Sequence, residues 1–219
     1  MSVRPNPFSD PRLVARYAEG PPRIVPGFDA LQRMTTLLLA ERVPEHGRVL
    51  VIGAGGGLEL KTFAESHPGW IFDGIDPSAE MLRLAQRALG SLAARATLHQ
   101  GYTEDAPEGP FDGATCLMTL HFLSLEERRR TTAEVHRRLK PGAPFVVANF
   151  CIPQDDERAV WLSRYATYAG IDPDQASTID SHLTILSPEQ DEAILRKAGF
   201  SNVSLFYAGF TFRGWVGYA

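Results

Sequence analysis

The chain reads RVLVIGAGGG over residues 48–57, and Asp76 follows nineteen positions after the last of these glycines. An apolar run rich in β-branched residues is typical of a strand buried in a parallel sheet. Glycines directly after such a strand let the backbone turn sharply and approach a ligand closely. Asp76 ends a second apolar run, where its carboxylate could accept hydrogen bonds from both hydroxyls of a ribose. The pattern therefore predicts a site for a cofactor that contains a nucleoside.

The spacing of the glycines separates two classes of cofactor. A dinucleotide-binding turn has its third glycine three residues after the second, and that position is Leu58 in this chain. Gly53, Gly55 and Gly57 stand closer together. A nicotinamide-dependent oxidoreductase thus stays an alternative, but Leu58 disfavours it.

Composition limits the classes of function. A chain of 219 residues with 44% hydrophobic and 22% charged content can bury one sizeable core. Its net charge of −4 gives no overall attraction for nucleic acid and favours a small or neutral acceptor. Cys116 and Cys151 fall in predicted buried strands, without metal-ligand spacing. We expect a cytoplasmic protein, monomer or homodimer, with no metal and no membrane partner, since no apolar run reaches the roughly 20 residues that span a bilayer and the first ten residues do not resemble a signal peptide.

Hydrophobic periodicity predicts a regular alternation of strands and helices. The predicted strands are residues 48–52, 70–76, 96–100, 113–118, 144–151, 203–208 and 211–218, and the predicted helices are 28–43, 58–66, 79–89, 125–139, 155–169 and 188–197. Strands that alternate with helices indicate a doubly wound α/β fold with a parallel sheet. The last two strands are separated only by Gly209-Phe210, which is too short for a crossover, so they must form an antiparallel hairpin.

Two segments, one at the N-terminus and one inside the chain, depart from this alternation. Residues 1–26 carry six prolines, which allow no more than a turn of helix near residues 13–18, and they are predicted to form an N-terminal arm. Residues 27–219 are predicted to form one domain. An insertion at about residues 152–186 is the segment in which we expect an acceptor pocket.

Four short motifs follow the glycine turn in order: PFDG at residues 110–113, LHFL at 120–123, LKPGA at 139–143 and KAGF at 197–200. Together with the glycine turn they resemble the motifs of class I S-adenosylmethionine-dependent methyltransferases, from about residue 28 to the end of the chain. The resemblance implies a Rossmann-like sheet of seven strands, mostly parallel with the antiparallel hairpin at its end. It also implies S-adenosylmethionine as cofactor and methyl transfer to a small organic acceptor.

The same resemblance implies which residues surround the cofactor. Asp76 is expected to bind the ribose and Tyr102 to flank the adenine, although Tyr102 could equally cover its own loop. The expected cofactor-binding residues are Gly53, Ala54, Gly55, Gly57, Asp76, Pro77, Met81, Tyr102, Thr103 and Thr119. Val51 departs from the family, which usually has an acid there, so polar support for the amino-acid tail of the cofactor is missing or supplied elsewhere.

His121 is the candidate catalytic residue. It follows the fourth predicted strand at the carboxyl edge, where ligands of open sheets bind, and an acceptor hydroxyl or amine would need a general base. A histidine packed in a loop is the alternative.

Two other functions stay open. Residues 23–28, RIVPGF, resemble the segment before the first helix of the carboxy-S-adenosylmethionine synthases of tRNA modification, which use a modified cofactor on this fold. The resemblance implies that the N-terminal arm folds back over the cofactor, so that Arg23 or Phe28 closes the site; a plain lead-in to the following helix is the alternative. A protein that binds S-adenosylmethionine without turnover is the second possibility, because no strong catalytic constellation accompanies Val51.

Overall fold

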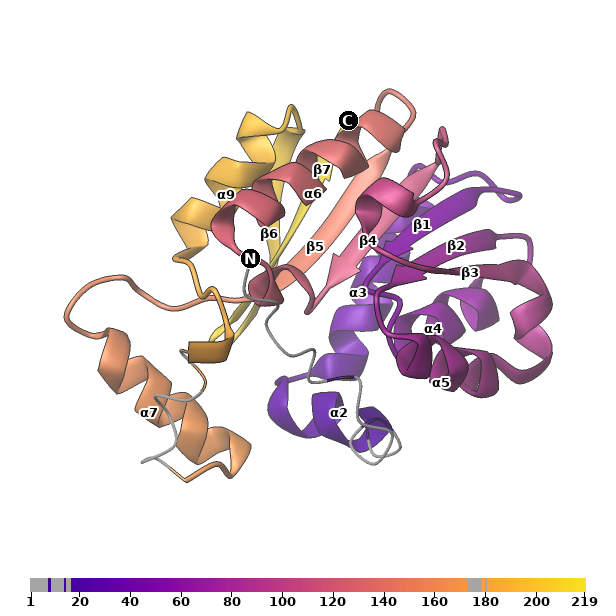
Figure 1. Ribbon diagram of the computed structural model, residues 1–219. Coiled ribbons are helices and arrows are strands. Elements are labelled where there is room, and N and C mark those ends of the chain that lie inside the picture. Colours follow the sequence, from indigo (N-terminus) through magenta and orange to yellow (C-terminus); the bar gives the residue numbers. More distant parts are fainter. Residues whose placement is uncertain (1–7, 9–13, 15–16, 173–178, 180) are drawn as a thin grey trace.

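A sheet of seven strands forms the centre of the molecule. The computed structural model describes residues 8, 14, 17–172, 179 and 181–219. Its strands are β1 (Arg48–Ile52), β2 (Ile71–Asp76), β3 (Ala96–Gln100), β4 (Gly113–Leu117), β5 (Pro144–Phe150), β6 (Ser201–Gly209) and β7 (Phe212–Tyr218). They lie in the order β3-β2-β1-β4-β5-β7-β6 (Figure 1).

Strand direction follows the prediction. The first five strands pair in parallel, whereas β7 pairs antiparallel with both β5 and β6. The predicted mostly parallel, doubly wound fold with a terminal antiparallel hairpin is therefore confirmed. Because the five parallel strands share one direction, their carboxyl ends, and the loops that follow them, meet at one edge of the sheet.

Helices cover both faces of the sheet (Figure 1). The principal helices are α2 (Gly20–Ile24), α3 (Phe28–Ala40), α4 (Leu58–Ser66), α5 (Ala79–Leu89), α6 (Leu125–Arg138), α7 (Arg158–Ala169) and α9 (Pro188–Lys197). Helices α3, α4 and α5 pack on one face, and α6 and α9 pack on the other. In the figure α2 and α7 lie beyond the carboxyl edge rather than on a face.

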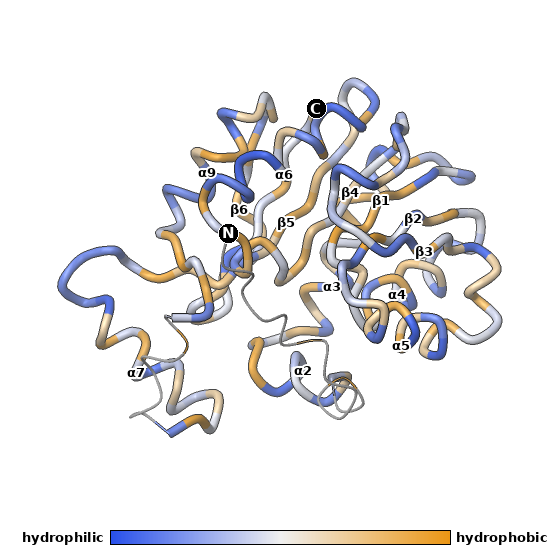
Figure 2. Tube along the Cα trace, viewed as in Figure 1, coloured by the Kyte–Doolittle hydropathy of each residue, from blue (hydrophilic) through white to orange (hydrophobic). Residues whose placement is uncertain are grey.

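Alternation along β1 divides the core into two layers. Val49 and Val51 face the layer beneath α3 and α4, and Leu50 and Ile52 face the layer beneath α6. All four are buried, as expected for a strand with helices on both sides. The apolar colouring of β1, β4 and β5 follows the same central region (Figure 2).

The hairpin turn lies one residue later than predicted. Gly209 pairs with Phe212, so Phe210 and Thr211 make the connection instead of Gly209 and Phe210. Position 209 requires a glycine because the Tyr207 hydroxyl fills the place where a Cβ would stand. The glycine thus leaves room for the Tyr207 side chain, and the turn begins at Phe210.

The N-terminal segment is partly described. Of the predicted arm, residues 1–7, 9–13 and 15–16 lie outside the described residues, so the predicted turn near residues 13–18 is only partly visible. Helix α2 was not predicted: its two prolines, Pro21 and Pro22, occupy the first turn, where proline removes no intrahelical hydrogen bond. In the described part of the chain, every helix is too short or too polar to cross a membrane.

Candidate functional site

The strand order reverses between β1 and β4, and at such a reversal open α/β sheets bind ligands in a crevice at the carboxyl edge. Gly53 begins the loop after β1, and Thr119 lies just beyond β4. The two meet across the crevice, since a Cβ on Gly53 would collide with the Thr119 side chain. The structure thus brings together these two predicted cofactor-binding residues, and Ala54 is buried beside them.

The glycine turn needs its glycines for backbone conformation and for space. Gly53, Gly55 and Gly57 have φ angles of 70°, 43° and 77°, in the left-handed region that other residues rarely adopt. A Cβ on Gly57 would also come within 2.8 Å of the Ala85 Cα on α5. The turn therefore holds α4 close against α5, and its glycines present backbone atoms without side chains to the crevice.

Asp76 lies beside this turn at the end of β2. Its Oδ2 accepts a hydrogen bond from Gly55 N at 3.1 Å, and its Oδ1 accepts one from Ser78 N at 2.8 Å. Burial raises the pKa of the carboxyl group above its usual value, while these two hydrogen bonds oppose the rise. Each oxygen keeps a lone pair free of these bonds, which suits a donor pair such as the hydroxyls of a ribose.

The other predicted cofactor residues lie around this carboxylate. Met81 is buried on α5, with its Cε 3.3 Å from the position of a Cβ on Gly55, and Pro77 is half-buried next to Asp76. Thr103 is buried, whereas Tyr102 is 59% exposed and its amide donates to Asp105 Oδ2. An exposed ring beside the tip of β3 is free to lie on a planar ligand, so the predicted role of Tyr102 stays a prediction.

Glu59 is a residue of this site that the sequence did not reveal. It is the second residue of α4, only 9% exposed, and it lies within electrostatic range of Asp76 and Tyr17. Burial raises the pKa of its carboxyl group to about 8, and the nearby Asp76 adds to the rise. An acid in a first helical turn is ordinarily a surface residue that complements the helix dipole, so the pattern gave no sign of its burial.

The position of Glu59 bears on the missing acid at residue 51. Val51 is fully buried inside the sheet and offers no polar group. Glu59 instead places a carboxyl group at the same glycine turn from the helix that follows it.

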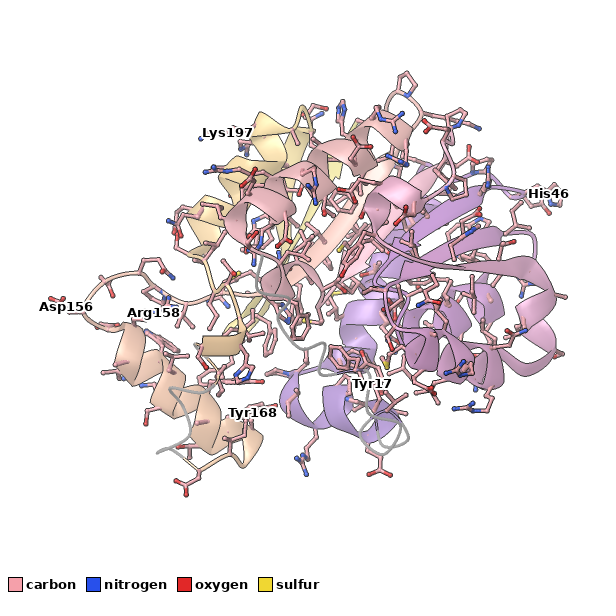
Figure 3. The ribbon with its side chains drawn as sticks, in the orientation of Figure 1. Tyr17, His46, Asp156, Arg158, Tyr168 and Lys197 are labelled. Carbon is pink, nitrogen blue, oxygen red and sulfur yellow. The ribbon has the colours of Figure 1, made fainter. Side chains whose placement is uncertain are left out.

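Residues of the N-terminal segment cover the turn. The Tyr17 ring lies against Gly56, 2.7 Å from the position of a Cβ there, and its hydroxyl lies near Gly55. Phe8 packs edge-on against both Tyr17 and Phe122, with ring centroids 5.9 Å and 5.3 Å away, and its carbonyl accepts a hydrogen bond from Ser78 Oγ. Figure 3 shows Tyr17 toward the middle of the molecule. The expected fold-back therefore involves Tyr17 and Phe8, while Arg23 is exposed and Phe28 packs on the core.

His121 follows β4 but is only 6% exposed. Its Nδ1 accepts a hydrogen bond from Phe150 N at 3.3 Å, which leaves the proton of the neutral ring on Nε2. Burial, with a smaller contribution from the Arg128 charge, lowers its pKa to about 3. The ring is thus neutral and fixed to β5, and a role as general base would require Nε2 to lose its proton first; that role stays a prediction.

A buried ion pair fixes the loop that carries His121. Arg128 of α6 pairs with Asp191 of α9, and both side chains are almost fully buried. The same guanidinium donates to the carbonyls of Leu120 and Thr184. Met118, just before this loop, has a φ of 56°, which is strained for a residue with a side chain. The loop after β4 is therefore held in one arrangement by groups that the sequence did not identify.

Comparison with known proteins finds similarity to methyltransferases. A family model described as a methyltransferase domain matches residues 49–142. The O-methyltransferase resE of Aspergillus sclerotiorum is 26% identical over 78% of this chain and 61% of its own length. The ubiquinone/menaquinone biosynthesis C-methyltransferase UbiE of Geotalea daltonii is 30% identical over 50% of this chain and 48% of its own. The chain therefore spans less than two thirds of the length of these relatives.

Solved structures agree on the fold. A Nostoc punctiforme protein that is provisionally described as an O-methyltransferase has a TM-score of 0.70 and 18% identity, over 95% of this chain and 59% of that one. PigF, solved with S-adenosylhomocysteine, has a TM-score of 0.67 and 18% identity, over 97% and 60%. The [4+2]-cyclase SpnF has a TM-score of 0.58 and 24% identity, over 80% and 59%. Because proteins that are described with different activities share the fold, the reaction has to be argued from the site.

Proposed function

We propose that this chain, a class I S-adenosylmethionine-dependent methyltransferase by its domain match and its fold, transfers a methyl group to a small organic acceptor. The observation that carries the proposal is the arrangement of Asp76 beside the bare backbone of the glycine turn, at the point where the strand order reverses. The O- and C-methyltransferase relatives support the same reaction class without agreeing on an acceptor. Neither a modified cofactor nor binding without turnover has specific support among the relatives.

The residues of the crevice fit this cofactor. Asp76 offers acceptor lone pairs for the ribose hydroxyls, and Met81 and Tyr102 offer an apolar and an aromatic surface for the adenine. Glu59 offers a carboxyl group for the ammonium of the amino-acid tail, in the place of the acid that Val51 lacks. Such a cation would stabilise the ionised form of Glu59, whose pKa is raised by burial.

The protein has a limited task in the transfer itself. When bound, S-adenosylmethionine supplies an already activated methyl group, so alignment of the acceptor and exclusion of water account for most of the catalysis. The loop fixed by Arg128 holds Thr119 and His121 at the end of β4. Tyr17 and Phe8 cover the turn from the solvent side. We also propose a cytoplasmic location, which suits the two free, buried cysteines.

Replacement of Asp76 tests the cofactor site. Asp76→Ala removes a partly buried acceptor of two ligand hydroxyls, and hydrogen bonds to a charged group contribute about 1.5–3 kcal/mol. We expect the affinity for S-adenosylhomocysteine, measured by isothermal titration calorimetry, to fall by at least about tenfold.

A matched control distinguishes this loss from unfolding. Glu80→Ala removes another acid of the same region, in the first turn of α5, which pairs with Arg83 on the surface, and should leave the affinity unchanged. Thermal melts of both variants confirm that they fold. Wild-type affinity in a folded Asp76→Ala variant would mean that the ribose binds elsewhere.

A further inference from the structure

A cavity of about 530 Å³ lies at the carboxyl end of β5, among the start of α7, the start of α9 and the β6–β7 turn. Its lining includes Ile152, Trp161, Glu189, Phe210, Thr211 and Arg213. None of the residues of the glycine turn lines it. The strand order places β4, with Thr119 and His121 beyond its end, between β1, which carries the glycine turn, and β5, which carries this cavity, so both lie at the same carboxyl edge of the sheet.

The wall of the cavity is aromatic and strained. The Phe210 ring packs against Trp161 and Tyr168, with centroids 5.7 Å and 5.5 Å away, and Tyr168 is visible on α7 in Figure 3. Phe210 has a φ of 55°, a conformation that is a genuine outlier for a bulky residue and that glycine adopts without cost. Its ring is also 37% exposed, so burial does not account for an aromatic residue there. Strain of this kind tends to mark ligand-binding positions.

The floor of the cavity holds an unsatisfied hydroxyl. Thr211 is 1% exposed, and its Oγ1 has no hydrogen-bond partner among the described residues. A buried hydroxyl without a partner is costly. Cys151 lies beside it, but its thiol already donates to Asp191 Oδ2. Thr211 Oγ1 is therefore a polar atom of a cavity-lining residue that still lacks a hydrogen-bond partner.

Arg213 supplies positive charge at the same place. Its Nη1 donates to the carbonyls of Phe210 and Phe212 at 2.7 Å and 2.8 Å, which fixes the guanidinium at the turn. Its Nε and Nη2 have no hydrogen-bond partner within the described part of the chain, and the exposed Glu189 carboxylate lies within electrostatic range of the guanidinium. The acids of the rim are exposed and engaged: Asp155 accepts from Glu157 N, and Glu189 accepts from Ser187 Oγ. Solvent screens these exposed charges more than it screens the half-buried guanidinium.

We propose that this cavity is the acceptor pocket and that it takes a planar aromatic carboxylate that carries a ring hydroxyl. The ring lies against Trp161 and Phe210, the carboxylate pairs with Arg213, and Thr211 Oγ1 gains a hydrogen-bond partner. In the transfer, a bond forms between the ring oxygen and the methyl carbon while the bond from that carbon to the sulfonium breaks. The sulfur keeps the electron pair, and the hydroxyl proton passes to water. This inference rests on the proposed methyltransferase function.

Binding can be measured apart from turnover. The protein saturated with S-adenosylhomocysteine is titrated with 4-hydroxybenzoate and, separately, with 4-hydroxybenzamide, which has the same shape without the charge. We expect the benzoate to bind roughly ten- to a hundredfold more tightly, as a charge-assisted pair with Arg213 requires. Arg213→Gln should abolish this preference and Arg213→Lys should retain part of it, while Arg129→Gln on the exposed face of α6 should leave it intact. Equal affinity for the two probes, or an unchanged preference in Arg213→Gln, would overturn the proposal.

A second variant separates binding from stability. Phe210→Gly removes the aromatic wall and also relieves the left-handed strain, so it should weaken 4-hydroxybenzoate binding at least about tenfold while the melting temperature stays level or rises. Unchanged binding would contradict the proposal whatever the melting temperature. Failure of the parent protein to bind S-adenosylhomocysteine would instead count against the proposed methyltransferase function. Methylation of neutral acceptors alone would count against the proposed acceptor pocket and would leave the methyltransferase function standing.

Discussion

At the scale of single residues, the chemistry of the crevice depends on carboxyl groups that the fold removes from water. Asp76 keeps two backbone hydrogen bonds that favour its charge, whereas Glu59 is more deeply buried and its pKa rises to about 8. In the protein without ligand, Glu59 is thus mostly protonated near neutral pH. In the unfolded chain it ionises at its usual value of 4.5.

This difference predicts a pH dependence of stability. Between about pH 4.5 and pH 8 the Glu59 carboxyl group keeps its proton in the folded state and has lost it in the unfolded state. The stability that Glu59 contributes to the folded state is therefore present in full below pH 4.5 and is lost as the pH rises toward about 8. The free energy of unfolding should fall by up to about 1.4 kcal/mol per pH unit from this group. Urea denaturation of the wild type and of Glu59→Gln across this range measures the effect as the difference between two curves. Parallel curves would show that Glu59 ionises normally in the folded protein.

At the scale of elements, Arg128 and Asp191 join α6 to α9 and hold the loop after β4 in place. Because both side chains are buried, removal of one leaves an uncompensated charge in the interior. Burial raises the pKa of Asp191, and the Arg128 charge opposes that rise.

We expect Arg128→Met to lower the free energy of unfolding by about 3–5 kcal/mol. Arg129→Met, its exposed neighbour, should change it by no more than about 0.5 kcal/mol. The double variant Arg128→Met with Asp191→Leu should recover much of the loss, because neither charge is then left unpaired. Chemical denaturation of the single variants, Asp191→Leu included, and of the double variant forms a double-mutant cycle. Strict additivity within that cycle would contradict the account of a coupled pair.

At the scale of the whole molecule, the sequence predicted the sheet and most element boundaries. Helices at residues 58–66, 79–89 and 188–197 match α4, α5 and α9 in full. Glycines, prolines and capping pairs next to a helix mark where it begins and ends, so these boundaries can be predicted from a single sequence. The one-residue error at the hairpin has a different origin, since the contact between Gly209 and Tyr207 depends on how side chains pack in the folded hairpin.

The candidate site was predicted unevenly for the same reason. Asp76 and the glycines follow from spacing along the chain. The burial of Glu59, the cover by Tyr17, and the left-handed Met118 and Phe210 depend on which segments meet in three dimensions, and no local pattern records that. The proposed acceptor pocket was anticipated in part: Ile152 and Trp161 fall in the insertion where the sequence led us to expect it, whereas the contribution of the hairpin turn belongs to this second group.

The central claim is methyl transfer, and the formation of S-adenosylhomocysteine tests it most directly. The protein is incubated with S-adenosylmethionine and a panel of small acceptors, and both S-adenosylhomocysteine and the methylated acceptor are quantified by mass spectrometry. We predict that the two products form in equal amounts with at least one acceptor, and that the Asp76→Ala variant forms little of either. S-adenosylmethionine that binds and is recovered unchanged with every acceptor would contradict the account and leave a cofactor-binding protein without turnover.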